Sequence, residues 1–383
     1  MTRHTTRREL LRCSLSGAGL LLLSPACSAG ASHTAGTARR DVRTDDELFD
    51  AALEALHQRA ADDQNFLSNH VPMVIDALYS LGRAEAIPDW MDEHFDTGRP
   101  GPRVARAIRK NEWRDALGEY DRYLDWRDFF LAELSGEAWK VVVRAWAPRF
   151  LPGLSGSATH GVIRTAHAIR SIERLDNDIR RVELASALAY WASRYEELPW
   201  DKSLAPKPNV ELALASVELR QPALAPPRGN IVTGLRSLHQ TPSFRSVAGL
   251  VDTSDPSRTI AQLTAAMARV FITNPTRRIH FTHAITAPSA ARLVAPYLDD
   301  ESVELATRYA WQAAAGLYTV YHEPGREPAA VDSLQRDELI DRAVSRGEPH
   351  GIKLAEACLR EASLADHADL WQAATDAAKN TRG

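Results

Sequence analysis

The sequence has few cysteines and none arranged in pairs. Its 383 residues include three cysteines, Cys13, Cys27 and Cys358, and no CxxC motif. Zinc-ribbon sites and thioredoxin-like redox pairs both use closely spaced cysteines, so neither is supported. The first two cysteines lie in a segment that reads as a targeting peptide. The mature chain therefore has no pair of cysteines for an intrachain disulfide.

Several common nucleotide and hydrolase motifs are also absent. The chain has no GxGxxG after a strand, no P-loop and no GxSxG elbow, which argues against a Rossmann site, a phosphate-binding loop and a serine hydrolase. Charge of one sign is lacking too, because 46 basic residues are interleaved with 50 acidic ones. Without a basic face to neutralise a phosphate backbone, nucleic acid is not expected as a partner.

The sequence contains no apolar run long enough to span a bilayer, which takes roughly 20 residues. The N-terminal apolar stretch covers only about residues 15–23 and follows the twin-arginine pattern TRRELLR, with Arg7 and Arg8. A small-residue region follows at 26–30. We predict a signal peptide in residues 1–30, read by the twin-arginine export machinery and leading to the periplasm or the exterior. A lipid anchor at Cys27 is the alternative.

What the rest of the chain does contain is helical periodicity. Apolar residues recur three and four positions apart in 48–60, 73–81 and 182–195, and strand-like alternation is scarce. We therefore predict an all-α fold.

Proline, glycine and serine mark the expected ends of the helices. Helix starts are predicted at Pro72, Pro88 and Pro288. Helix ends are predicted at Gly82, Gly153 and Gly347. The serines that could cap a following helix are Ser302 and Ser333.

One segment, 199–229, interrupts the helical pattern with six prolines, which exclude a continuous helix. It divides the region 43–380, which follows a polar linker at 31–42, into halves 43–198 and 230–380. We expect a single large multi-helix body with this irregular proline-rich segment laid over its surface. Two separate helical domains are the alternative.

Four stretches of the mature chain place basic side chains in apolar or cap-like settings. These side chains are His70, His160, His167, His280, His283, His350 and Lys353. His160 and His167 are two helical turns apart on one face, and Lys353 is three positions after His350. Imidazole suits iron, copper and zinc. No HExxH or two-histidine-one-carboxylate pattern is present, so spacing alone leaves a metal site and ordinary core histidines both open.

Taken together, these stretches resemble the questin oxidase-like family. The segments that carry the resemblance are 65–81 (NFLSNHVPMVIDALYSL), 158–170 (ATHGVIRTAHAIR), 185–199 (ASALAYWASRYEELP), 280–296 and 350–360 (HGIKLAEACLR). The resemblance spans about 45–375, and its motifs are distinctive only in combination. It implies a helical fold and an oxygenase that opens quinone-type rings of aromatic polyketides by Baeyer–Villiger-like or dioxygenase steps.

The resemblance also implies a non-haem iron site of several histidines and a carbamylated lysine, with a small aromatic substrate and O₂ as partners. The positions that match family histidines or lysine are His70, His160, His283, His350 and Lys353. His167 departs from the family pattern, which has an aromatic residue there and a histidine in place of Arg164. We predict His167 to be a catalytic, substrate-facing base, with a spare ligand as the alternative.

Two other functions stay open from the sequence. The first is an exported binding protein that keeps the same helical fold and has no catalysis. The second is a metal-free Baeyer–Villiger oxidation assisted by NADPH, although no NADPH site is visible in the sequence.

Overall fold

The computed structural model describes residues 43–57, 68–95, 101–201, 204–220, 230–326, 333–365 and 367–380. The predicted signal peptide, the linker and Cys27 all lie outside these ranges. Arg43–Gly383 form one compact unit. Among the described helices, none is both long and apolar enough to cross a membrane.

The described secondary structure is helical apart from isolated bridge residues, such as the pair Lys207 and Val251, which confirms the all-α prediction. The helices of the first half are α1 (Asp45–Leu56), α2 (Val71–Ser80), α3 (Ile87–His94), α4 (Tyr123–Gly136), α5 (Trp139–Phe150), α6 (His160–Arg174) and α7 (Asp178–Ser193). Those that follow are α8 (Val210–Ala215), α9 (Ile231–Arg236), α10 (Pro256–Thr273), α11 (Arg278–Val294), α12 (Asp300–Tyr321), α13 (Arg336–Arg346), α14 (Pro349–Leu364) and α15 (Ala368–Asn380).

Short 3₁₀ segments link many of these helices. They are η2 (Ala84–Ala86), η3 (Trp113–Ala116), η4 (Tyr120–Arg122), η5 (Leu151–Gly153), η6 (Ser237–Gln240), η7 (Pro242–Leu250), η8 (Pro275–Arg277) and η9 (Ala295–Tyr297). The described part of the proline-rich segment is irregular as predicted, except that it contains the six-residue helix α8.

Two of the three proline starts are confirmed and one is wrong. Pro72 and Pro88 lie in the first turns of α2 and α3. Pro288 instead lies buried inside α11, where its missing N–H costs the helix one hydrogen bond. Helix α11 packs against α6, α10, α12 and α14, and this burial on several sides stabilises a helix that the local sequence would interrupt.

Two of the predicted glycine helix ends are confirmed, whereas both predicted serine caps are wrong. Gly82 and Gly347 follow α2 and α13 with φ of +71° and +69°, the left-handed conformation that glycine adopts without strain. Ser302 is not a cap, because the Asp299 side chain accepts from its backbone N–H at the start of α12. Ser333 also fails as a cap, since Gln335 occupies that position before α13.

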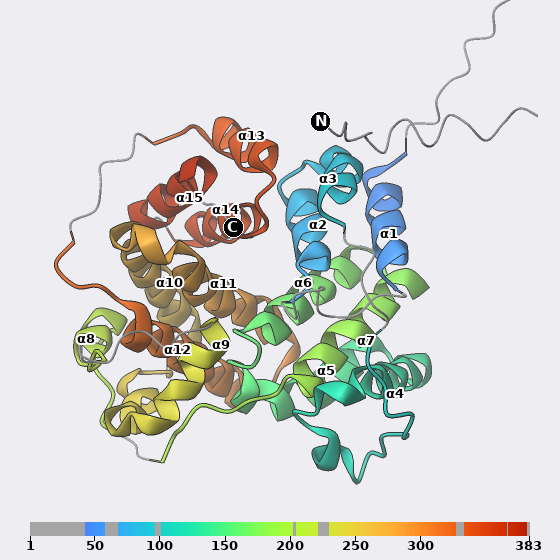
Figure 1. Cartoon of the computed structure of the whole chain (residues 1–383), viewed down its shortest axis with the longest axis horizontal. Coiled ribbons are helices and arrows are strands. Elements are labelled where there is room, and N and C mark those ends of the chain that lie inside the picture. Colours follow the sequence, from blue (N-terminus) through green and yellow to red (C-terminus); the bar gives the residue numbers. More distant parts are fainter. Residues whose placement is uncertain are drawn as a thin grey trace, which may run out of the picture. The chain divides into compact units, whose positions relative to one another are not determined.

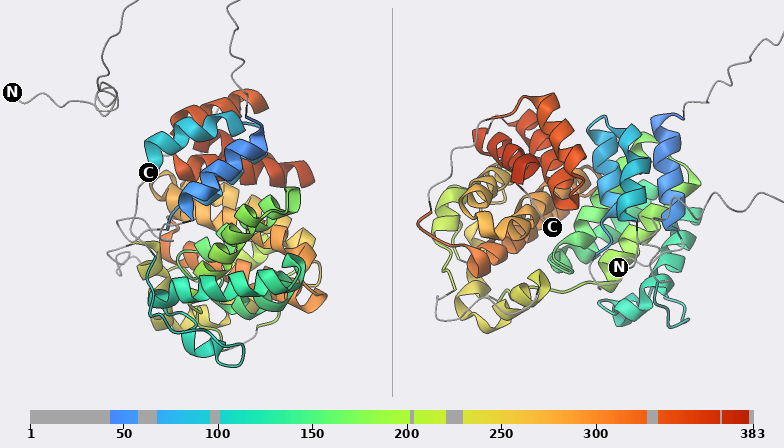
Figure 2. Two further views of the ribbon diagram at one scale, coloured as in Figure 1. Left: turned by 90° about the vertical axis from the view of Figure 1, so that its right-hand side faces the viewer. Right: turned by 45° about the horizontal axis from the view of Figure 1, so that its top comes forward.

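Four helices pack as a closed ring near the middle of the unit. Helix α2 contacts α6, α6 contacts α11, α11 contacts α14, and α14 contacts α2. Figure 1 shows α2 beside α14 and α6 beside α11, and Figure 2 gives the same neighbours from two further directions. Because α2 and α6 come from the first half and α11 and α14 from the second, the two halves form one helical body.

Candidate functional site

Each helix of this ring contributes one histidine to a common centre. His70 immediately precedes α2, His160 is the first residue of α6, His283 lies in the second turn of α11 and His350 is the second residue of α14. Lys353 follows one turn after His350 and is 3% exposed. The structure thus brings together all five residues for which the family resemblance implies a metal site; we call them the histidine cluster.

The four imidazole rings are neighbours in the same cyclic order as their helices. The distances between ring centroids are 5.0 Å from His70 to His160, 4.6 Å from His160 to His283, 5.6 Å from His283 to His350 and 4.6 Å from His350 to His70. Residues up to 280 positions apart in sequence therefore face one small volume.

The backbone that delivers His160 is strained. Ser157, Ala158 and Thr159 have φ of 49°, 55° and 69°, and left-handed conformations of non-glycine residues cost of order 1–3 kcal/mol each. Gly161 allows α6 to approach α7 closely, because a Cβ at this position would lie only 2.7 Å from Cδ1 of Trp191. Strain of this kind persists only where the surrounding structure enforces it.

Hydrogen bonds fix the orientation of two rings. Nδ1 of His160 lies 2.7 Å from the carbonyl oxygen of Ser157, and Nδ1 of His350 lies 2.9 Å from Oε1 of Glu348. In each case Nδ1–H donates, so Nε2 of the neutral ring keeps its lone pair. Metal-binding histidines are commonly held in this way, by a carbonyl or a carboxylate on the other nitrogen.

Burial shifts every base of the cluster toward its neutral form. Loss of solvent lowers the pKa of His70, His160 and His283 well below 6.5. The pKa of His350 is also lowered by burial, although Glu348 opposes the shift. Burial lowers the pKa of the Lys353 amine to about 7, again against the pull of Glu348. Neutral imidazoles and a neutral amine have the lone pairs that a protonated base lacks.

The donor atoms fit a metal ion in part. Two nitrogens that share one ion at about 2.0–2.1 Å stand about 2.9–3.4 Å apart, for angles from 90° to tetrahedral. Nε2 of His70 and Nε2 of His160 are 2.9 Å apart. Nδ1 of His283 is buried and has no hydrogen-bond partner among the described residues, and a buried polar atom of this kind is commonly completed by a water or an ion.

The fit is incomplete for the other rings. In the part of the chain that the structure describes, no three His, Cys, Asp or Glu side chains have donor atoms spaced for one ion. The donor chemistry and the His70–His160 pair therefore suit a metal, while the rings of His283 and His350 would have to turn toward that pair to join it.

His167 lies apart from the cluster. It is two turns of α6 beyond His160, roughly 10 Å along the helix axis, and its Nδ1 is 2.7 Å from Oδ2 of Asp76. The charged groups that act on its pKa are Asp76, Arg170 and Glu356. Sequence reasoning missed this second cluster, the ion network, which consists of Asp76, His167, Arg170, Arg174, Glu356 and Arg360.

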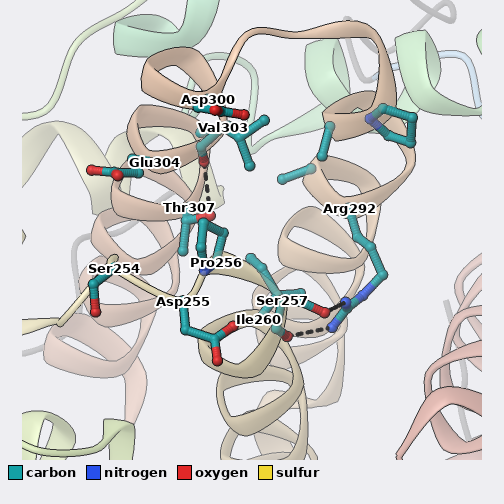
Figure 3. Close-up of a pocket in the computed structure, with 14 residues that line it drawn as sticks. Ser254, Asp255, Pro256, Ser257, Ile260, Arg292, Asp300, Val303, Glu304 and Thr307 are labelled. Atoms are coloured by element: carbon teal, nitrogen blue, oxygen red, sulfur yellow. Dashed lines mark hydrogen bonds between the residues drawn. The ribbon is translucent and has the colours of Figure 1, made fainter.

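Two further features lie away from the histidine cluster. The ring of His280 packs against that of Tyr321, with 3.9 Å between centroids. A surface cavity of about 560 Å³ lies between α10, α11 and α12, and Figure 3 shows Arg292 at its side, hydrogen-bonded to Ser257. None of the residues that line this cavity belongs to the histidine cluster.

An all-helical body that buries four neutral imidazoles and an amine defines a protein with a preformed centre of nitrogen donors. The chain belongs to the questin oxidase-like family, whose model matches residues 67–358. That match includes every residue of the histidine cluster. No curated protein matched the chain. Family membership indicates an oxidoreductase, an oxygenase that acts on aromatic substrates.

Proposed function

We propose that this protein oxidises a polycyclic aromatic or quinone-type substrate at a non-haem iron bound by the histidine cluster. The observation that carries the proposal is the convergence of four buried imidazoles from four helices, two of them with Nε2 atoms 2.9 Å apart. Iron bound there would supply the redox chemistry by which O₂ is activated.

Electrostatics favour an anionic group at this position. Three of the four histidines stand at the N-termini of α2, α6 and α14, where helix dipoles create positive potential. Neutral imidazoles do not offset that potential, and Glu348 is engaged by His350 and by the backbone N–H of Gly351. A cation bound in this setting therefore needs an anionic ligand.

We assign that role to Lys353. Its buried amine, with a pKa of about 7, is substantially neutral at physiological pH. The amine nitrogen forms a bond to the carbon of CO₂ and releases one proton, which yields a carbamate with two oxygen donors. Carboxylate-type oxygens suit a hard metal ion, and the bound ion would in turn hold the carbamate against loss of CO₂.

His167 is our candidate for the catalytic base. Its Nδ1 donates to Asp76, the arrangement that holds an imidazole in one tautomer with Nε2 able to accept a proton. The buried setting lowers its pKa, so the ring is neutral at pH 7 and competent as a base.

Metal analysis of the purified full chain tests the proposal. We expect one iron per chain in the wild type and loss of iron in His160→Ala. The matched control is His239→Ala, since His239 is exposed in η6, where its Nε2 lies 3.2 Å from the carbonyl oxygen of Glu197, and this variant should keep its iron. Metal-free wild-type protein that binds quinones would support the exported binding protein, and turnover that needs NADPH and no metal would support the NADPH-assisted oxidation.

We also propose that the chain is exported by the twin-arginine route, on the basis of the TRRELLR pattern. Replacement of Arg7 and Arg8 with lysine should abolish export, measured by immunoblotting of cell fractions. A double-lysine variant that reaches the exterior at the wild-type level would show that another route is used.

A further inference from the structure

Three hydroxyl groups meet next to the segments that carry His70 and His160: those of Ser68 and Tyr190, which are buried, and that of Ser157, which is half-buried. Oη of Tyr190 lies 2.5 Å from Oγ of Ser68 and 2.7 Å from Oγ of Ser157, and the two serine oxygens are 3.2 Å apart. Each hydroxyl can donate one hydrogen bond and accept others, so the three can form a closed cycle. We call this group the hydroxyl triad.

The triad joins the two chain segments that carry His70 and His160, whose Nε2 atoms are 2.9 Å apart. Ser68 is two residues before His70. Ser157 is three residues before His160, and its carbonyl oxygen accepts from Nδ1 of His160 at 2.7 Å. Tyr190 is the member that connects these segments to a regular helix, α7.

The same region of α7 restrains α6 a second time. Trp191, the residue after Tyr190, is in close contact with Gly161, at a separation that leaves no room for a Cβ. The strained run at 157–159 thus lies between a hydroxyl contact on one side and a packing contact on the other. Strained backbone relaxes when the contacts that enforce it are removed.

We propose that Tyr190 is a positioning residue that sets the separation of the imidazoles of His70 and His160. Its hydroxyl holds the segment before α2 against the left-handed turn before α6, and through them the two Nε2 atoms at 2.9 Å. The consequence for metal binding rests on the proposed function, whereas the positioning itself does not.

A core tyrosine that needed only a hydrogen-bond partner would not require this arrangement. One carbonyl oxygen would satisfy a buried phenol. Here the partners are two serines 89 residues apart in sequence, each within three residues of a different histidine. The geometry therefore points to a link between the two histidine segments.

Titration of the metal-free full chain with Co²⁺ tests the link, because its absorption spectrum reports the geometry of its ligands. Tyr190→Phe removes only the hydroxyl. We expect Co²⁺ affinity to fall about 10–100-fold, as for other residues that orient metal ligands, with an altered Co²⁺ spectrum. The matched control is Tyr297→Phe, since Tyr297 is 7% exposed and its hydroxyl bonds to Glu173; its Co²⁺ affinity and spectrum should equal those of the wild type.

A second variant keeps the test decisive if Tyr190→Phe folds poorly. Ser68→Ala breaks the triad with a smaller change, and we expect it to weaken Co²⁺ binding in the same direction. In the double variant Ser68→Ala/Tyr190→Phe the two losses should not add, because both substitutions break one unit. Full additivity would contradict a linked triad.

The outcomes separate this inference from the proposed function. Wild-type affinity and spectrum in Tyr190→Phe would overturn the inference alone. A wild-type protein that binds no Co²⁺ or Fe²⁺ would overturn the metal proposal. In that case imidazole ¹⁵N shifts of His70 and His160 in the metal-free protein still report the positioning: a change in Tyr190→Phe supports it, and identical shifts refute it.

Discussion

The histidine cluster and the ion network share three helices, although the cluster also uses α11, and they differ in whether their buried groups meet opposite charges. Helices α2, α6 and α14 supply His70, His160 and His350 at their N-termini and Asp76, Arg170 and Glu356 further along. In the network every charge meets an opposite charge, for example Nε of Arg170 at 2.9 Å from Asp76. In the cluster four imidazoles and an amine face each other.

The pKa shifts express the same contrast. In the network, burial acts to raise the pKa of Asp76 and Glu356, but the guanidinium groups, that of Arg170 foremost, hold both below their usual values, that of Glu356 at about 2. In the cluster, burial prevails and all the bases become easier to deprotonate. Buried groups whose charges are mutually satisfied are typical of structural networks, whereas unsatisfied groups with shifted pKa values are typical of functional sites.

If this contrast is correct, substitutions in the two regions should separate folding from ligand binding. We consider three substitutions in order of their expected effect on the free energy of unfolding.

The largest effect is expected for Asp76→Ala. It removes the buried carboxylate that Arg170 and Arg174 share, so that Arg170 keeps only Glu356 of its two carboxylate partners in the ion network. Removal of one member of a buried ion pair costs about 3–5 kcal/mol. Urea unfolding of the full chain measures the loss. Asp341→Ala is the control, because its ion pair with Arg83 is 64% exposed on the aspartate side and contributes about 0–1 kcal/mol.

The fraction of Asp76→Ala that remains folded tests metal binding separately from stability. Folded Asp76→Ala should still bind one metal ion per chain, since the hydrogen bond and ion pairs of Asp76 in the ion network join it to His167, Arg170 and Arg174 and not to the cluster. Equal losses of stability in Asp76→Ala and Asp341→Ala would mean that the network does not support the fold.

An intermediate effect is expected for Lys353→Ala. Its amine forms no ion pair or hydrogen bond with another residue in the described part of the chain. Its removal should therefore cost only the packing of the aliphatic stem, up to about 2 kcal/mol. Metal affinity should fall by at least about 100-fold, measured by metal analysis and titration, and added short carboxylic acids should partly restore it. Lys140→Ala is the surface control.

Full metal occupancy in Lys353→Ala would remove the carbamate from the proposal. The remaining coordination position would then fall to another group, which cannot be His167 because it lies roughly 10 Å from His160 along α6. A Lys353→Ala variant that loses both its metal and its folded structure would instead show that Lys353 supports the fold, as the residues of the ion network do.

The sequence predicted the helices and the cluster residues because both depend on local pattern or on the family resemblance. Helical periodicity, and the glycines at which helices end, depend only on residues close together in sequence. Helices α2 and α7 accordingly begin and end within a few positions of the predicted bounds. Pro288 was misplaced because its tolerance depends on the helices that pack around α11.

The partners of the site residues could not be predicted in this way. Asp76 and Arg170 lie 94 positions apart and Ser68 and Tyr190 lie 122 apart, so nothing in either local segment indicates the contact. One signal was available: Glu348 stands three residues before Gly351 at a helix start, the spacing of an N-terminal cap, and the structure shows that bond together with the one to His350.

The smallest effect on stability is expected for His167→Asn, which decides whether His167 acts only within the ion network or also as a catalytic base. The asparagine amide can replace Nδ1–H as donor to Asp76 but has no atom in the place of Nε2, the atom that a base requires. We expect the free energy of unfolding to change by less than about 1 kcal/mol and the metal content to stay at the wild-type level. If His167 is the base, turnover falls about 10²–10⁴-fold, and the pH dependence of the remaining rate loses its ionisation on the acidic side. Wild-type turnover in His167→Asn, with stability lost only in His167→Ala, would make His167 a structural member of the ion network and leave the proton transfer to another group.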